Sequence, residues 1–204
     1  MNNVKNSIGW AEYTWNPITG CKRGCQYCYA RRINERFNKT PFDKIIFHPE
    51  RLEEPMPKKF SIIFVGSMSD IEYWNHADTQ KIIDKIEYKN HQFMFLSKSP
   101  FSYHGFMWPN NTMQGLTMTL EEHQDDQTRK AITMIRNSIR PYLSIEPILG
   151  ELKIFKPMHL FHTIIVGAMT GPGAIKPKRE WIQSIKDNIP PNEIYWKKNI
   201  RKCL

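Results

Sequence analysis

The sequence predicts an α/β fold on a parallel sheet, an open and partial TIM-type (β/α)6 barrel. Three observations support this prediction. From residue 60 onward, short runs rich in β-branched and aromatic residues recur at intervals of roughly 20 to 30 residues, the size of a βα unit. Helical patterns with an apolar stripe follow these runs. The chain has 204 residues, which is too short for a full eight-unit barrel of about 250 residues.

The expected strands are the apolar runs that end in clusters of Gly, Ser or Thr. They cover residues 12–15, 60–65, 92–96, 112–118, 141–145, 163–166 and 193–196. The helices expected between them are marked by apolar residues on one face. These residues are Ala30, Ile33 and Phe37; Ile82, Ile83 and Ile86; Ile132 and Ile135; and Trp181, Ile182, Ile185 and Ile189. Such stripes favour helices that lie on a sheet.

Composition limits the class of protein. Apolar residues make up 40% and charged residues 24% of the chain, which is typical of a globular protein. No run approaches the roughly 18 apolar residues of a membrane span, and the first residues lack the pattern of a signal peptide. We expect one domain over residues 1–204, no membrane association, and a cytoplasmic location that keeps thiols reduced.

The formal charge of +9 and the pI near 9.4 make polyanions plausible partners. Basic residues gather near the cysteines and at the end of the chain; they are Lys22, Arg23, Arg31, Arg32 and Arg36, and Lys197, Lys198, Arg201 and Lys202. Two interpretations stay open. The basic residues bind nucleic acid or a nucleotide-like substrate, or they form a solvated surface that offsets the negative charge of a thiolate-bound cluster.

Three of the four cysteines, Cys21, Cys25 and Cys28, have the spacing C-x3-C-x2-C, and Cys203 is expected to be an incidental thiol. In a reducing compartment, such a group indicates a metal site before it indicates disulfides. Three thiolates can hold three irons of a [4Fe–4S] cluster and leave the fourth iron open. S-adenosylmethionine (SAM) can chelate that iron, and its one-electron cleavage yields a 5′-deoxyadenosyl radical. Gly24 is expected to let the backbone wrap closely around the cluster.

A zinc knot and a thiol cluster with no metal are the alternatives. Zinc takes four ligands, usually from CxxC pairs or Cys/His sets. The nearest following histidine, His48, is twenty residues beyond Cys28, and no second CxxC follows. The spacing therefore favours iron–sulfur.

Six blocks of sequence, in order, resemble one protein family. They are Trp15-Asn-Pro-Ile-Thr-Gly-Cys21 with Cys25 and Cys28-Tyr-Ala30; Phe64-Val-Gly-Ser-Met-Ser-Asp70; Phe95-Leu-Ser-Lys98-Ser-Pro100; Leu143-Ser-Ile-Glu146-Pro-Ile-Leu-Gly150; Ile165-Val-Gly167; and Thr170-Gly-Pro-Gly-Ala174. Over nearly its whole length the chain resembles phage- and prophage-associated radical-SAM-like proteins. The resemblance implies a partial (β/α)6 barrel of the radical SAM kind in a bacterial or phage-infected host cell. It also implies an external one-electron reductant.

The resemblance further implies which residues contact SAM. Gly66, Ser67 and Ser69 are expected at its amino group. Thr117, Thr119, Ser144 and Glu146 are expected at its ribose or carboxylate, and Gly167 and Ala168 along its adenine. This chain departs from its relatives at Thr119, where they commonly carry an acid, at Lys98-Ser99-Pro100 (Lys-Arg-Pro) and at Ala168-Met169-Thr170 (Gly-Glu-Ser).

Three residues carry both a functional and a structural hypothesis. Glu146 is expected to be catalytic, or else to cap a helix or form an ion pair. Lys98, also a catalytic candidate, binds an anionic group or pairs with Glu146. Asp70 takes part in function or caps a helix.

The leading hypothesis is a radical SAM enzyme acting on a nucleic-acid base or a nucleotide-derived substrate, with phage DNA hypermodification as one possibility. The alternatives are radical chemistry on a peptide or small metabolite, and a nucleic-acid-binding module whose zinc or iron–sulfur knot is structural.

Overall fold

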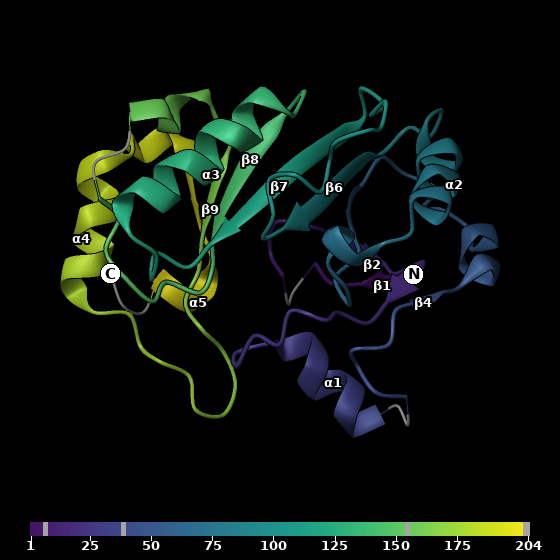
Figure 1. Ribbon diagram of the computed structural model, residues 1–204, viewed down its shortest axis with the longest axis horizontal. Coiled ribbons are helices and arrows are strands. Elements are labelled where there is room, and N and C mark those ends of the chain that lie inside the picture. Colours follow the sequence, from purple (N-terminus) through teal and green to yellow (C-terminus); the bar gives the residue numbers. More distant parts are fainter. Residues whose placement is uncertain (6–7, 38–39, 154–155, 202–204) are drawn as a thin grey trace. The chain divides into compact units, whose positions relative to one another are not determined.

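The computed structural model describes residues 1–5, 8–37, 40–153 and 156–201. Cys203 lies outside these residues. The chain forms two compact units, which Figure 1 shows coloured along the sequence. The first unit comprises residues 1–97 and 104–113, and the second comprises residues 98–103 and 114–204. The single domain expected over residues 1–204 stays a prediction.

The first unit is built on a mostly parallel sheet. Its strands β1 (Asn2–Asn3), β2 (Tyr13–Trp15), β5 (Ile62–Val65) and β6 (Gln92–Ser97) are neighbours in that order. β2, β5 and β6 pair in parallel, and β1 pairs antiparallel with β2. Two short strands, β3 (Ile18–Thr19) and β4 (Ile46–Phe47), form a separate antiparallel pair. Because β2 and β5 are parallel, the loops that follow them meet at the same edge of the sheet.

The helices of the first unit lie between its strands along the chain. α2 (His76–Ile86) begins after Asn75, whose side chain accepts the N–H of Ala77. The unit also contains α1 (Tyr29–Phe37) and two short 3-10 helices, η1 (Pro49–Glu53) and η2 (Ile71–Tyr73). In α2 the stripe Ile82, Ile83 and Ile86 is buried, as the sequence predicts.

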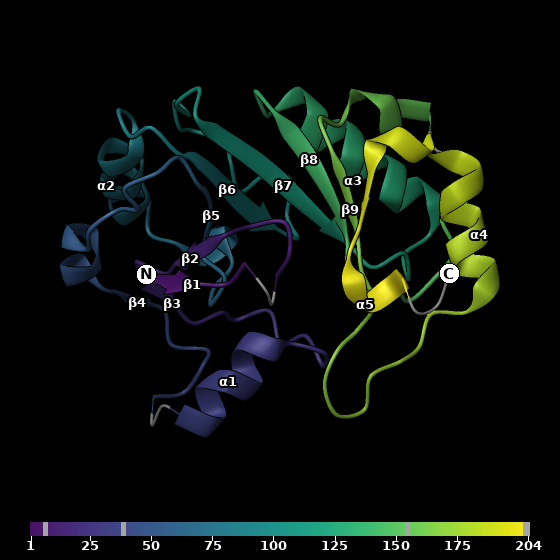
Figure 2. The same ribbon diagram turned by 180° about the vertical axis from the view of Figure 1, so that it is seen from behind.

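The prediction for the first helix stripe is wrong. α1 forms where expected, but only Ala30 of its residues is buried, while Ile33 and Phe37 are exposed. In both Figure 1 and Figure 2, α1 lies apart from α2 at the edge of the unit. A helical period of apolar residues predicts that one face of the helix is apolar. It does not predict whether this protein's own sheet or another surface packs against that face.

The second unit contains four parallel strands, β7 (Thr112–Met118, from Gln114 onward), β8 (Pro141–Ile145), β9 (Ile164–Val166) and β10 (Ile194–Trp196). Its helices are α3 (Gln124–Arg136), η3 (Lys156–Leu160), α4 (Arg179–Asn188), η4 (Pro191–Glu193) and α5 (Lys198–Arg201). Figure 1 shows α3 in front of β8 and β9, and Figure 2 shows the opposite face of these strands.

The two faces of these four strands differ in chemistry. Register places Leu116, Leu143 and Ile164 side by side on one face. The neighbouring positions Thr117, Ser144, Ile165 and Tyr195 share the other face, because successive side chains of a strand alternate. At these positions the first face is apolar, and the second carries the hydroxyls of Thr117 and Ser144.

The fold class is therefore mixed α/β with mostly parallel strands, as the sequence predicts. Closure into a partial barrel stays a prediction. Among the described residues, no helix is long and apolar enough to cross a membrane.

Candidate functional site

The cysteine loop joins β3 to α1. The N–H of Cys21 donates to the carbonyl of Phe42 at 2.7 Å, and that of Cys28 to Cys25 at 3.2 Å. Cys21, Cys25 and Cys28 are free thiols, and each is half-buried. The N–H of Arg31 lies 3.4 Å from Cys28 Sγ, within hydrogen-bonding distance. Hydrogen bonds to sulfur are one of the means by which proteins tune iron–sulfur clusters.

Of the two glycines in this loop, Gly20 is the one that lies tightly against other protein backbone. Both have positive φ, +94° and +73°. A Cβ on Gly20 would lie 2.1 Å from the carbonyl oxygen of Lys44, whereas a Cβ on Gly24 would meet no protein atom within 4 Å. The positive φ of Gly24 suits a glycine, while its close approach to a cluster stays a prediction.

Backbone contacts tie the cysteine loop to the loop after β5. The N–H of Gly20 donates to the carbonyl of Met68 at 2.9 Å, and Gly20 forms a parallel bridge with Ser69. The hydroxyl of Tyr29 donates to the carbonyl of Ser67 at 2.7 Å. The loop predicted to hold a cluster and the loop predicted to hold SAM's amino group are therefore adjacent.

Asn16 reinforces this arrangement from the end of β2. Its side-chain oxygen accepts the Ser67 hydroxyl at 3.1 Å and the Met68 N–H at 3.0 Å. Its own carbonyl accepts Arg51 at 2.8 Å, and the carbonyl of Arg51 accepts the indole N–H of Trp15 at 2.9 Å. One amide side chain thus fixes the loop after β5 against the strand that leads to the cysteines.

Charge adds a third tie. The guanidinium of Arg23 pairs with Glu72 and lies 3.5 Å from Asp70. Asp70 caps η2 by accepting the N–H of Glu72 at 3.1 Å, and it accepts the Ser97 hydroxyl at 2.6 Å. The capping hypothesis for Asp70 is confirmed, and the same carboxylate also joins the ends of β5 and β6 to the cysteine loop.

Burial raises the pKa of the Cys21 thiol above its ordinary value, and the charge of Asp70 adds to the rise. The backbone N–H of Arg23 acts in the opposite direction. The raised pKa disfavours the thiolate form of Cys21 in the metal-free protein. Because a metal ligand must be a thiolate, metal binding at this position must release the thiol proton.

The loop after β5 is itself tightly held. Gly66 has φ +80°, and a Cβ there would lie 2.6 Å from the Trp74 ring. The indole N–H of Trp74 donates to Ser69 Oγ at 2.9 Å. The Ser69 hydroxyl is therefore engaged within the loop, while the predicted SAM contacts of Gly66, Ser67 and Ser69 stay predictions.

The donor set fits an iron–sulfur cluster in its chemistry. Thiolates are the ligands of such clusters, and the three thiols lie on one half-buried loop. Across the described ranges, no three His, Cys, Asp or Glu side chains are grouped around a single-ion position. Thiolates on three different irons of a cubane need not share one ion, so this spacing is compatible with a cluster.

In the second unit, polar groups meet at the carboxyl ends of neighbouring strands. Lys197, directly after β10, pairs with Glu146, directly after β8. Gly167 follows β9 between them, and a Cβ there would lie 2.9 Å from Glu146 Oε1 and from Lys197 Cδ. Ser144 lies on the same face, 1% exposed, and its hydroxyl has no partner among the described residues. The ion-pair hypothesis for Glu146 is confirmed, with Lys197.

The remaining predicted residues lie near this cluster in sequence but differ in their contacts. Thr119 is buried, and its hydroxyl donates to Glu121 at 2.9 Å. The carbonyl of Ala168 accepts the side-chain amide of Asn199 at 2.7 Å. Lys98 is half-buried. The SAM contacts of Thr117, Thr119, Ser144, Gly167 and Ala168 and the catalytic roles of Glu146 and Lys98 stay predictions.

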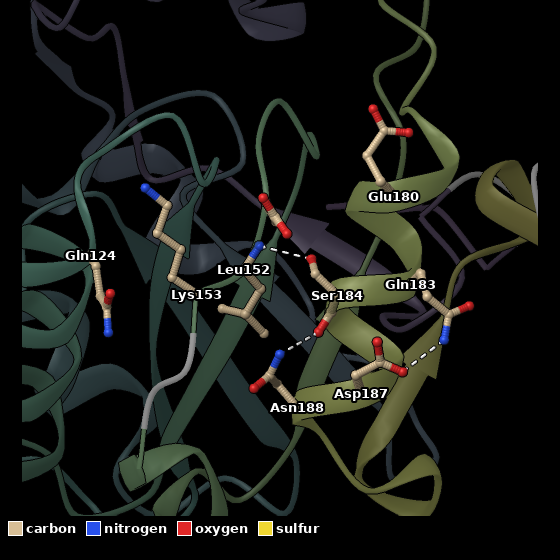
Figure 3. Close-up of a pocket in the computed structure, with 9 residues that line it drawn as sticks. Gln124, Leu152, Lys153, Glu180, Gln183, Ser184, Asp187 and Asn188 are labelled. Carbon is tan, nitrogen blue, oxygen red and sulfur yellow. Dashed lines mark hydrogen bonds between the residues drawn. The ribbon is translucent and has the colours of Figure 1, made fainter.

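A hollow elsewhere in the second unit does not include any predicted site residue. Figure 3 shows it between Gln124, Lys153 and α4. Some of its polar groups bond to one another: the Leu152 N–H donates to Ser184 Oγ at 3.0 Å, and the Gln183 side-chain amide donates to Asp187 at 2.7 Å. It adds nothing to the candidate site.

Sequence reasoning missed Asn16, Arg23 as a tether and Lys197. Asn16 lies within the Trp-Asn-Pro block, so that block was a usable signal. Arg23 and Lys197 were only seen as members of basic groups, because their partners lie 49 and 51 residues away in the sequence.

Comparison with known proteins gives a family and a fold. The family model described as protein of unknown function (DUF5131) matches residues 5–199. No curated protein matches the chain significantly. Among solved structures, the chain is similar to a mutant of spore photoproduct lyase with dinucleoside spore photoproduct, with a TM-score of 0.52 and 18% identity over 70% of this chain. The match spans about half of that lyase, 47% of its length.

Proposed function

The chain belongs to the DUF5131 family, and we propose that it is a radical SAM enzyme that binds a [4Fe–4S] cluster through Cys21, Cys25 and Cys28. The observation that carries the proposal is the tie between the cysteine loop and the loop after β5, made by Gly20, Tyr29 and Asn16. Two loops that would hold the cluster and SAM must be adjacent, and these loops are. The shared fold with spore photoproduct lyase, a radical SAM enzyme, supports the same chemistry.

The protein's own residues position and shield the reactants. A bound cluster and SAM would supply a 5′-deoxyadenosyl radical by one-electron cleavage. The three thiolates hold the cluster, and Asn16 and Tyr29 fix the backbone of the loop that would receive SAM's amino group. Within the second unit, Ser144, Glu146 and Lys197 offer a hydroxyl and an ion pair to the polar groups of a ligand. Such pre-organised groups orient reactants at no further cost in reorganisation.

The proposed substrate is a nucleic-acid base or a nucleotide-derived molecule, with phage DNA as one source. The net charge of +9 supports a polyanionic substrate. The similar lyase structure contains a dinucleoside photoproduct, and a ligand of that kind supports the same class of substrate for this chain. Reaction on a peptide or small metabolite is the second enzymatic alternative.

Anaerobic reconstitution with iron and sulfide tests the chemistry. We expect the wild-type protein to gain an iron–sulfur absorption spectrum and to form 5′-deoxyadenosine from SAM when dithionite is added. Replacement of Cys21, Cys25 or Cys28 by Ala should abolish both, while Cys203→Ala, a matched control outside the motif, should retain both. A reducible cluster that never yields 5′-deoxyadenosine would falsify the enzyme proposal and favour a structural knot.

The substrate class needs its own measurement. DNA nucleosides from cells or phage with and without the gene can be compared by mass spectrometry. A nucleoside that is present only with the intact gene and lost in the Cys25→Ala variant would support the nucleic-acid substrate. Identical nucleosides in all samples would contradict it.

A further inference from the structure

Helix α1 carries an apolar stripe that stays exposed among the residues that the structure describes. Tyr29, Ile33 and Phe37 recur every four residues and thus share one side of the helix. They are 45%, 43% and 70% exposed, and Ala30 is the only buried residue of α1. A contiguous exposed apolar stripe marks a surface that meets a partner.

The rim of this stripe is cationic. Arg32 and Arg36 occupy the adjacent row of the helix, and the Arg36 guanidinium lies 5.1 Å from the Phe37 ring centre. Lys22, on the cysteine loop, is exposed. An apolar centre with a charged rim is the usual anatomy of a protein–protein interface. Its complement is an apolar patch rimmed by carboxylates, and a second copy of α1 would oppose arginine with arginine.

The position of α1 links this surface to electron entry. The helix begins at Tyr29, directly after Cys28, and the N–H of Arg31 lies 3.4 Å from Cys28 Sγ. A protein docked on the first turns of α1 is therefore beside a ligand of the proposed cluster. Nucleic acid suits the stripe less well, because the aliphatic side chain of Ile33 at its centre offers no hydrogen bond or charge to a phosphate.

Resting on the proposed function, we propose that the exposed face of α1 (Tyr29, Ile33 and Phe37 with Arg32 and Arg36) is the docking surface for the electron donor. The partner is an acidic one-electron donor protein with an apolar centre to its interface. In the transfer, a flavin of the donor is oxidised from hydroquinone to semiquinone as the cluster gains one electron, from 2+ to 1+. Interfaces of this kind are small and transient.

The test compares two reductants. Reconstituted protein is mixed anaerobically with a reduced flavodoxin, used as an acidic donor protein, or with dithionite, and loss of cluster absorbance is followed. We expect Ile33→Ser/Phe37→Ser and Arg32→Glu/Arg36→Glu to slow reduction by flavodoxin about tenfold or more at low salt. Dithionite, which is small, should reduce all variants alike. The control Lys58→Glu/Lys89→Glu makes the same charge change near the amino ends of β5 and β6, and should leave the flavodoxin rate within about twofold.

A binding measurement separates this proposal from the proposed function. Calorimetric titration of flavodoxin into the cluster-free protein should give a Kd that weakens in both α1 variants and not in the control. Equal rates and equal Kd values in all variants would overturn the docking surface. Displacement of flavodoxin by a short DNA duplex, with DNA binding lost in the α1 variants, would assign the surface to nucleic acid instead. If dithionite fails to reduce even the wild-type cluster, the proposed function fails, and the Kd values still decide the docking surface.

Discussion

At the residue scale, Gly20 and Gly24 show how one loop uses two glycines differently. Both adopt positive φ, which costs an L-residue roughly 1–2 kcal/mol. Only Gly20 also faces a backbone carbonyl at a distance no Cβ can tolerate. Substitution of each glycine by alanine can therefore separate the cost of backbone strain from the cost of steric overlap within the same loop.

We expect Gly24→Ala to lower the free energy of unfolding by about 1–2 kcal/mol. Gly20→Ala should lower it by about 3–5 kcal/mol, because overlap with the Lys44 carbonyl is added to the strain. Urea unfolding of the cluster-free proteins measures both values. Equal losses for the two variants would show that the Lys44 carbonyl can move away.

Lys197 and Glu146 also belong to the residue scale. Their pairing explains why a glycine, Gly167, stands between them after β9. The sequence around each residue does not indicate the other. Sequence patterns depend on residues that are close along the chain, whereas Lys197 and Glu146 are brought together by the pairing of strands.

At the element scale, the cysteine loop depends on ties to the loop after β5. Arg23 supplies the charged tie, to Glu72 and Asp70. The side chains of these three residues are only partly exposed. Removing one partner of such a pair leaves a carboxylate without compensation.

Arg23→Gln should therefore cost about 1–3 kcal/mol of unfolding free energy and reduce the iron bound on reconstitution. The matched control is Arg129→Gln on α3, whose pair with Asp126 is exposed and worth at most about 1 kcal/mol. Urea titration and iron content give the comparison. Similar losses of unfolding free energy and of bound iron in both variants would contradict a special role for Arg23 in holding the cysteine loop.

Strands were the elements best predicted from the sequence. β7 and β8 have the expected bounds and β2, β5, β6, β9 and β10 differ by a residue or two at their ends, because β-branched runs between turn residues give an unambiguous signal. The two-residue strands β3 and β4 are too short to produce any pattern. The cysteine motif and its neighbouring loop were also predicted, whereas the tethers Asn16, Arg23 and Lys197 depend on tertiary contacts that no local period encodes.

At the scale of the whole molecule, two histidines, one buried and one half-buried, make the free energy of unfolding depend on pH. Burial lowers the pKa of His91, with the charge of Lys89 adding to the effect, and burial lowers the pKa of His48, with Arg51 adding to it. The unfolded chain therefore binds more protons than the folded one below the ordinary pKa of about 6.5. The contribution of these two histidines to the free energy of unfolding is fully present above that pH, and it is lost as the pH falls from there toward their lowered pKa values in the folded protein.

His91→Gln removes one of these titrations. We expect the free energy of unfolding to fall less steeply between pH 7 and pH 5 in this variant than in the wild type, as measured by urea titration at each pH. Lys89→Gln, which keeps the histidine, should retain most of the wild-type slope because burial is the larger cause. An unchanged slope for His91→Gln would assign the dependence to other groups.

The alternation of chemistry across β7 to β10 also limits how this chain can evolve. Thr117, Ser144 and Lys197 lie on one face, and Leu116, Leu143 and Ile164 lie on the other. Inserting or deleting a single residue within one of these strands would exchange the two sets, moving the hydroxyl and charged groups to the face of Leu116, Leu143 and Ile164. Length changes inside these strands are tolerable only in even numbers. New specificities should arise instead by substitution on the polar face, or by loop length beyond the strand ends, where parity does not apply.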